Sequence, residues 1–176
     1  KEEEFQKTSA NNLTERLYKE VRDTFSRKTE TIAKQAFPVI KNVFEQRGEM
    51  FKNIVVPFTD GKRAYNVVAN LEKTYKSEGE ELIRAYEKSI MLAHIDDAWK
   101  EHLREMDDLK QSVQNATYEQ KDPLLIYKFE SFNLFKSMVD KINKNVVSTL
   151  MKGQIPFEAP EEVKQAEEKR TDLSKM

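Results

Sequence analysis

Two histidines and two pairs of adjacent carboxylates are the residues best suited to bind a metal ion or to transfer protons. His94 and His102 stand eight residues apart, with Asp96-Asp97 between them and Asp107-Asp108 shortly after. Eight residues span about 12 Å along an α-helix, too far for both imidazoles to bind one metal ion. Adjacent helical residues point about 100° apart, and Asp96 with Lys100 is an ordinary i,i+4 pair on a solvated face. We therefore expect neither a metal site nor a catalytic carboxylate pair.

Motifs for nucleotide binding or covalent catalysis are missing from the sequence. It lacks the loops G-x-x-x-x-G-K-[ST] and G-x-G-x-x-G and the nucleophile elbow G-x-S-x-G. Zero cysteines exclude disulfides, thiolate metal ligands and a cysteine nucleophile. The 30 Lys and Arg nearly balance the 31 Asp and Glu, whereas nucleic-acid binders carry a basic excess. We expect no catalytic residue, no cofactor bound by this chain alone, and no nucleic-acid partner.

One aromatic residue lies outside any apolar pattern. Tyr118 stands in the polar segment 114–122, close to Gln120 and Lys121. Such a tyrosine is either exposed on a loop or packed back on its own helices, and the local sequence leaves both open. Trp99 and the phenylalanines of 129–135 instead recur at helical spacing, which favours packing in a core over contact with a ligand.

The elements that must position these residues are mainly helices. Apolar residues recur every three or four positions, which predicts helices over about 12–36, 80–113 and 123–150. At 1.5 Å per residue the last two are about 55 Å and 45 Å long, and the short connection between them favours antiparallel packing. The sequence therefore predicts a stiff helical hairpin.

Capping residues and one turn signal define where these elements begin and end. Asn12 with Glu15, and Ser77 with Glu80, resemble capping boxes, while Asp122-Pro123 is typical of a helix start. Gly153, followed by Pro156, predicts the end of the last helix. Asp60-Gly61 lies between two β-branched and aromatic runs, 54–58 and 64–68, which predicts a small β-hairpin. The fold class expected is mainly α with this one β-hairpin.

The limits of the chain and its hydropathy bear on location. No apolar run approaches the ~18 residues that a membrane-spanning helix requires, so we expect a soluble cytoplasmic protein. The chain starts KEEEF, without an initiator Met or the layout of a secretory signal, which indicates an excised fragment.

Two consecutive stretches resemble a known family. IMLAHIDDAWKEHLREMDDLKQSV and then YEQKDPLLIYKFESFNLFKSMV are similar to the helical scaffold of the SecA protein-translocation motors, with the signatures WKEHL, MD-x-L and Y-x-QKDP in order. The resemblance implies a helical wing over 1–79 with the β-hairpin near 54–68, a scaffold segment and two-helix finger over 80–153, and a charged linker over 154–176. The stretch 37–75 looks like an insertion relative to the shorter all-helical wing, and the sequence suggests no function for it.

The resemblance also implies roles for particular residues. The finger-loop tyrosine of the family contacts the translocating polypeptide at the channel mouth, and Tyr118 aligns with it, with Gln120 and Lys121 as neighbouring contacts. The family commonly has Leu-Arg-Gly before that tyrosine, whereas 115–117 is Asn-Ala-Thr here, which removes a basic group and a glycine. The scaffold signature implies packing against the motor and regulation of its ATP cycle by four residues: Trp99, Lys100, His102 and Leu103.

Partners and cofactors follow from the same resemblance. It implies the rest of the SecA motor, the SecYEG channel and unfolded preproteins as partners, at the cytoplasmic face of the inner membrane. ATP and Mg belong to motor domains that this sequence does not contain, so the chain itself is expected not to be an enzyme. Two other readings stay open: a helical scaffold that dimerises as a coiled coil without touching substrate, and a metal hydrolase, which would need clustered ligands.

Overall fold

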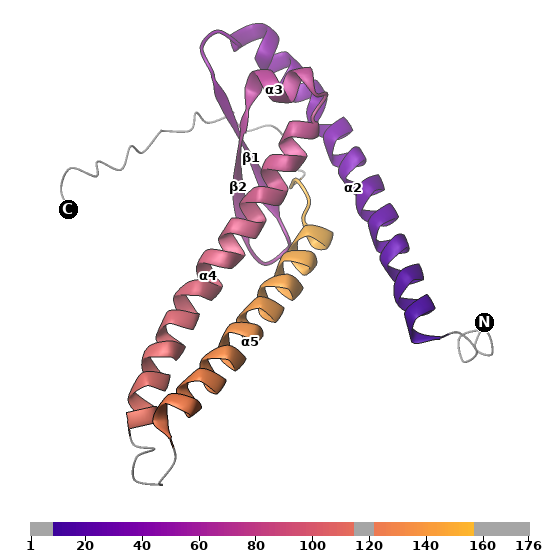
Figure 1. The fold of residues 1–176 in the computed structure, drawn as a ribbon. Coiled ribbons are helices and arrows are strands. Elements are labelled where there is room, and N and C mark those ends of the chain that lie inside the picture. The colour runs from indigo at the N-terminus through magenta and orange to yellow at the C-terminus, as the bar shows by residue number, and fades with distance from the viewer. Residues whose placement is uncertain (1–8, 115–121, 157–176) are drawn as a thin grey trace, which may run out of the picture. The chain divides into compact units, whose positions relative to one another are not determined.

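The computed structural model describes residues 9–114 and 122–156 (Figure 1). In chain order the elements are α2 (Ala10–Arg47), β1 (Asn53–Thr59), β2 (Ala64–Asn70), α3 (Leu71–Lys76), α4 (Glu80–Gln114) and α5 (Pro123–Lys152). The prediction of a mainly helical fold with one small β-hairpin is confirmed. The described residues form two compact units: the first holds those up to Val56 together with Val67–Ala85, and the second holds Pro57–Asn66 and Tyr86–Pro156.

Helix α2 differs from its prediction at both ends. It begins at Ala10 rather than near residue 12, because the hydroxyl of Ser9 accepts the backbone N–H of Asn12 and caps the helix. It also continues through Pro38 to Arg47, although the predicted end was Ala36.

Tertiary packing explains why α2 continues past its proline. A proline inside a helix costs about 3 kcal/mol, because it removes one hydrogen bond and crowds the preceding turn. The turns beyond it are held in the first unit by Ile40, which is buried, and by Phe44, whose ring stacks on Tyr75 at 4.2 Å. Burial of Ile40 contributes about 1.5 to 3 kcal/mol, and the stacking of the half-buried Phe44 ring adds about 0.5 to 1.5 kcal/mol, so together they offset the proline.

The predicted β-hairpin forms, with strands slightly longer than the apolar runs suggested. Gly61 has a φ of +84°, the left-handed conformation that primed hairpin turns require. The carboxylate of Asp60 accepts the backbone N–H groups of Lys62 at 2.9 Å and Arg63 at 2.8 Å, which fixes the turn. These hydrogen bonds to the charged form lower the pKa of Asp60.

A short helix, α3, follows the hairpin and was not predicted. The side chain of Asn70 accepts the backbone N–H of Lys73 and caps it, and the chain then turns through Glu78 and Gly79, both with positive φ. The hydroxyl of Ser77 does receive an N–H from the first turn of α4, but that of Glu81 rather than the predicted partner. Six residues are too few for the apolar periodicity that signals a longer helix.

From Tyr86 onward, α4 lies beside α5 and antiparallel to it in the second unit, as predicted (Figure 1). With 35 and 30 residues they are about 53 Å and 45 Å long. Asp122 caps α5 by accepting the N–H groups of Leu124 and Leu125, with Pro123 in the first turn. Gly153 ends it, so both predicted boundaries of this helix are confirmed.

Candidate functional site

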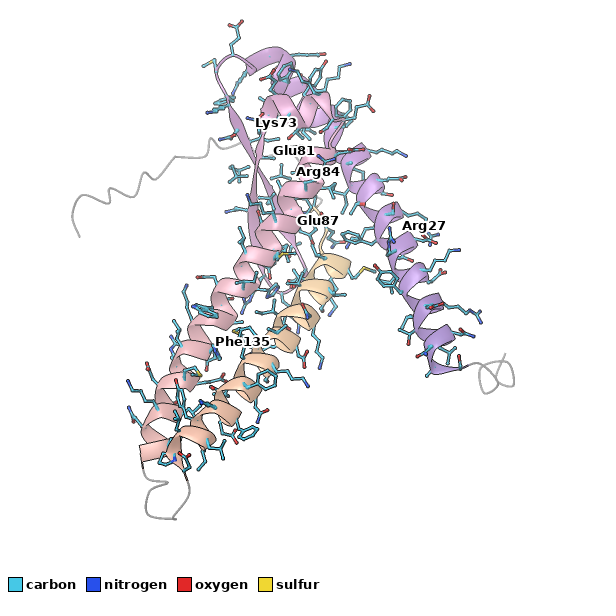
Figure 2. All side chains as sticks on the ribbon, in the orientation of Figure 1. Arg27, Lys73, Glu81, Arg84, Glu87 and Phe135 are labelled. Carbon is cyan, nitrogen blue, oxygen red and sulfur yellow. The ribbon has the colours of Figure 1, made fainter. Side chains whose placement is uncertain are left out.

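The signature residues of α4 form a small aromatic cluster with α5. The centre of the Trp99 ring lies 5.7 Å from that of His102, and the His102 and Phe135 rings meet edge to face with their centres 6.1 Å apart. Figure 2 shows Phe135 on α5, beside α4. His102 is buried, whereas Trp99 and Phe135 are each 47% exposed. The cluster is therefore a partly open contact between two helices rather than an enclosed core.

The buried histidine of this cluster has an unused ring nitrogen. Nδ1 of His102 is buried and has no hydrogen-bond partner among the residues that the structure describes. Leaving a buried polar group unpaired costs about 1 to 3 kcal/mol. A general base needs hydrogen-bond reach to the proton that it removes, and no described group offers one at this nitrogen. Among the described residues, the ring of His102 contacts those of Trp99 and Phe135.

Lys100 and Leu103 lie on the solvent side of the same helix. The ammonium of Lys100 is 2.5 Å from the carboxylate of Asp96, one turn earlier on α4. That hydrogen bond raises the pKa of Lys100, but both side chains are exposed, so the pair contributes little to stability. Leu103 is also exposed. Both residues are thus accessible to another protein surface.

The prediction that Trp99 and the phenylalanine stripe pack in a core is wrong for this chain. Phe129, Phe132 and Phe135 are exposed, and so are three apolar residues that continue the stripe of α4: Leu92, Ile95 and Leu103. Two antiparallel helices bury only the narrow strip where their ridges interlock, whereas these apolar stripes are wider than that. An apolar surface left open in this way is typical of an interaction site.

The base of the helical hairpin is tightly packed around Tyr86 of α4. Tyr86 is 1% exposed, its ring stacks on Phe58 at 4.2 Å, and its hydroxyl donates to the carbonyl of Thr149 on α5 at 3.1 Å. A Cβ at Gly153 would lie 2.8 Å from Cζ of Tyr86, closer than real side chains approach. The glycine that ends α5 therefore also makes room for this tyrosine.

Electrostatics at this base follow from burial. Burial, together with a smaller effect of the negative charge of Asp60, raises the pKa of Tyr86 to about 12. Nε2 of His94 lies 2.8 Å from the hydroxyl of Thr149, the residue whose carbonyl accepts from Tyr86. His94 and His102 thus have separate surroundings, and the described residues contain no group of three metal-ligating side chains.

The turn of the β-hairpin also belongs to this base. Thr59 of β1 exchanges two backbone hydrogen bonds with Gln154, at 2.8 Å and 2.9 Å, and Arg63 pairs with Asp97 of α4 at 3.1 Å. Pro57 lies two residues before Thr59 and faces the same edge of β1. Because proline has no N–H to donate, the ladder of hydrogen bonds cannot continue regularly past this residue. Among the described residues, this edge of β1 pairs outside the hairpin only at Thr59, with Gln154.

Sequence reasoning did not find the residues of this base. Tyr86 falls inside the helix predicted over 80–113 without being singled out, and Gly153 was predicted only as a helix end. No local pattern links Phe58, Tyr86 and Thr149, which are far apart in the sequence. The one available signal was Gly153 itself, because a glycine has no side chain and lets a large group pack closely against the backbone.

Comparison with known proteins identifies the family. The profile of the SecA Wing and Scaffold domain matches residues 1–154. The chain belongs to the SecA Wing and Scaffold family. It is 54% identical over 165 residues to the protein translocase subunit SecA of Phocaeicola vulgatus, covering 94% of the chain and 15% of that protein. It is 53% identical to that of Bacteroides thetaiotaomicron and 46% identical to that of Porphyromonas gingivalis W83, in each case over 99% of the chain and 17% of the relative.

The chain therefore spans about one sixth of the length of these SecA proteins. No solved structure gives a significant match to it. Across residues 9–114 and 122–156, none of the helices combines the length and the apolar character needed to cross a membrane.

Three residues that the SecA resemblance singles out lie outside the described residues. Tyr118, Gln120 and Lys121 fall in 115–121, between the end of α4 and Asp122. Helices α4 and α5 flank this segment in the sequence. Their contact with substrate or channel stays a prediction.

Proposed function

We propose that this chain is the wing and scaffold part of a SecA protein-translocation motor, and that its α4–α5 hairpin transmits movement of the motor to segment 115–121. The observation that carries the proposal is the packing at the base of the hairpin. Tyr86, Phe58 and Thr149 are buried there, and Tyr86 contacts both β1 and α5. A helical arm transmits displacement only if its base is held.

The magnitude of the packing supports this role. Fully burying a large apolar side chain contributes about 1.5 to 3 kcal/mol, and Phe58, Tyr86 and Ile90 are each almost completely buried. The one hydrogen bond from Tyr86 to α5 adds about 1 kcal/mol. Together these terms far exceed thermal energy, so the base resists opening while the arms extend about 45 Å or more.

In this proposal Tyr118 contacts unfolded preprotein at the mouth of the SecYEG channel, with Gln120 and Lys121 as polar neighbours. A tyrosine ring offers a large apolar area and one hydroxyl, so it can hold varied side chains without sequence selectivity. ATP and Mg are bound by motor domains elsewhere in the parent protein, at the cytoplasmic face of the membrane. The exposed faces around Trp99 and Leu103 supply surface for contact with that motor.

The test places a photo-crosslinking residue at Tyr118 of the full-length parent while a stalled secretory substrate occupies the channel. We expect crosslinks to the substrate. In transport assays, Tyr118→Ala should lose most activity, whereas Tyr118→Phe should keep much of it because the ring remains. Crosslinks confined to the parent's own chain, together with normal transport by the alanine variant, would leave only a scaffold role.

A second candidate is a scaffold that dimerises through its apolar faces as a coiled coil. The exposed rings of Phe129 and Phe132 favour it, because such a face needs a covering surface. Mass measurement in solution over a range of concentrations separates the two proposals. A monomer at all concentrations favours the hairpin working inside a larger motor, whereas a concentration-dependent elongated dimer favours the coiled coil.

A further inference from the structure

A polar cleft of 640 Å³ lies in the second unit, between the turn of the β-hairpin and one face each of α4 and α5. Six cationic side chains line it: Lys62, Arg63, Lys100, Arg104, Lys141 and Lys152. Three carboxylates line it as well: Asp60, Asp97 and Glu101. The lining therefore has an excess of three positive charges, whereas the chain as a whole carries −1. Positive charge is concentrated here on a nearly neutral protein.

The carboxylates of the cleft are already engaged. Asp97 pairs with Arg63 at 3.1 Å, and Glu101 pairs with Arg104 at 3.0 Å. Asp60 is held by two backbone N–H groups of its own turn. Asp97 and Glu101 are therefore engaged by other cations, whereas the charge of Asp60 also attracts Lys62 in the same turn.

Three lysines in the cleft remain without an ion pair to any residue that the structure describes: Lys62, Lys141 and Lys152. They come from two elements, because Lys62 lies in the hairpin turn and the others are on α5. Lys141 and Lys152 are eleven residues apart, or about 16 Å along the helix. This separation is between backbone positions, and the long lysine side chains extend from them into the same cleft, so the cleft suits a ligand that carries several linked anionic groups.

Neutral hydrogen-bonding groups complete the wall. Ser148 and Asn145 lie between the two lysines of α5, on the same face. Tyr65 of β2 lines the cleft too, and its buried hydroxyl has no partner among the described residues. Hydroxyl and amide N–H groups donate hydrogen bonds to phosphate oxygens, as ammonium groups do, but they carry no net charge.

We propose that this cleft binds a phosphate-bearing ligand through Lys62, Lys141 and Lys152. Phosphate oxygens carry enough charge to hold several lysines, and lysine is a common phosphate ligand. The phosphates come either from a soluble polyphosphorylated molecule or from the headgroups of an anionic membrane surface, and both present several phosphates close together. The site contains residues of the 37–75 insertion, so it gives a role to a segment for which the sequence suggested none. The proposal does not rest on the proposed function of segment 115–121.

The experiment titrates the 176-residue chain with inorganic tripolyphosphate by calorimetry, and in parallel with phosphatidylglycerol and phosphatidylcholine vesicles by flotation. The test variant is the double substitution Lys141→Ala and Lys152→Ala. Its control is Lys110→Ala with Lys128→Ala, which removes the same charge from exposed positions on α4 and α5 that do not line the cleft. Circular dichroism verifies that both variants keep the helical content of the parent.

We expect tripolyphosphate or phosphatidylglycerol vesicles to bind the unmodified chain and the control alike. Affinity of the test variant should fall roughly tenfold or more, because two direct charge contacts are lost. Binding of tripolyphosphate alone assigns the soluble source, and binding of phosphatidylglycerol vesicles alone assigns the membrane source. Absence of binding to both probes at low salt would overturn the proposal. So would an equal loss of affinity in test and control variants, because only the overall charge would then matter.

Discussion

The substitution Gly153→Ala tests the packing at the base of the helical hairpin most directly. The new methyl group would meet the hydroxyl of Tyr86 far inside van der Waals contact, and would lie 2.8 Å from its Cζ and 3.1 Å from the carbonyl of Thr149. Gly153 has a φ of −60°, which alanine adopts freely, so the backbone adds no strain of its own. The whole effect must therefore arise from the clash.

Its magnitude follows from how little Tyr86 can move. The ring is 1% exposed and stacked on Phe58, so it cannot swing into solvent to relieve the clash. Forcing extra volume into a close-packed site costs about 1 to 3 kcal/mol, and this contact belongs at the upper end of that range. For a domain of this size, about 2 to 3 kcal/mol corresponds to a melting temperature lowered by roughly 4 to 12 °C.

A double-mutant cycle separates the clash from other effects of the substitution. Tyr86→Phe alone should cost about 1 kcal/mol, since it removes one hydrogen bond from a carbonyl that also accepts from the backbone N–H of Gly153. Gly153→Ala should cost less by at least about 1 kcal/mol in the Tyr86→Phe background, because the nearest atom is gone.

The measurement is urea unfolding of the 176-residue chain, followed by circular dichroism. Gly61→Ala serves as the control: its Cβ meets nothing within 4 Å, so its cost comes only from positive φ and should add to that of Tyr86→Phe. Additive free energies for Gly153→Ala and Tyr86→Phe would refute the proposed contact.

Two further predictions concern the same base. Burial raises the pKa of Tyr86 to about 12 in the folded chain, above its value of about 10 in the unfolded chain, so its contribution to stability is complete below pH 10 and is lost as pH rises from 10 to 12. Urea unfolding at pH 9 and pH 11.5 should therefore show a smaller loss of stability for Tyr86→Phe than for the parent, and equal losses would contradict the assignment. Arg63→Ala should change the free energy of unfolding by only about 0.5 kcal/mol, because Arg63 and Asp97 are both well exposed and water screens their attraction. A loss above about 1.5 kcal/mol in the same assay would show that this ion pair fixes the turn.

Local chemistry made several elements predictable from the sequence. Asp122-Pro123 marks the start of α5 because the first N–H groups of a helix have no partner within it. The acidic cap accepts hydrogen bonds from such groups, and the proline has no N–H that would need a partner. Asp60-Gly61 marks the hairpin turn because glycine alone among these residues adopts positive φ without cost. Each signal depends on residues close in sequence, and each gave the correct position.

Features that depend on distant residues could not be predicted in this way. The continuation of α2 through Pro38 depends on the contact of Phe44 with Tyr75, about thirty residues later. Spacing correctly placed Trp99 and Phe135 on helix faces, but a single sequence does not say how many helices surround a face. The contacts of Tyr86 similarly required the fold before they could be seen.

The distribution of burial along α4 and α5 bears on how the hairpin could work. Large side chains are almost fully buried at the base, where Tyr86 and Ile90 pack, whereas the outer faces of the arms expose Leu92, Trp99 and Phe132. A half-exposed ring or isobutyl group forgoes about 1 kcal/mol relative to full burial, so these faces together leave several kcal/mol to be gained from a covering surface. A partner that covered them in one state and uncovered them in another could therefore bias the position of the arms without disturbing the base. In the proposed motor, that partner would be the part of the parent protein that binds ATP.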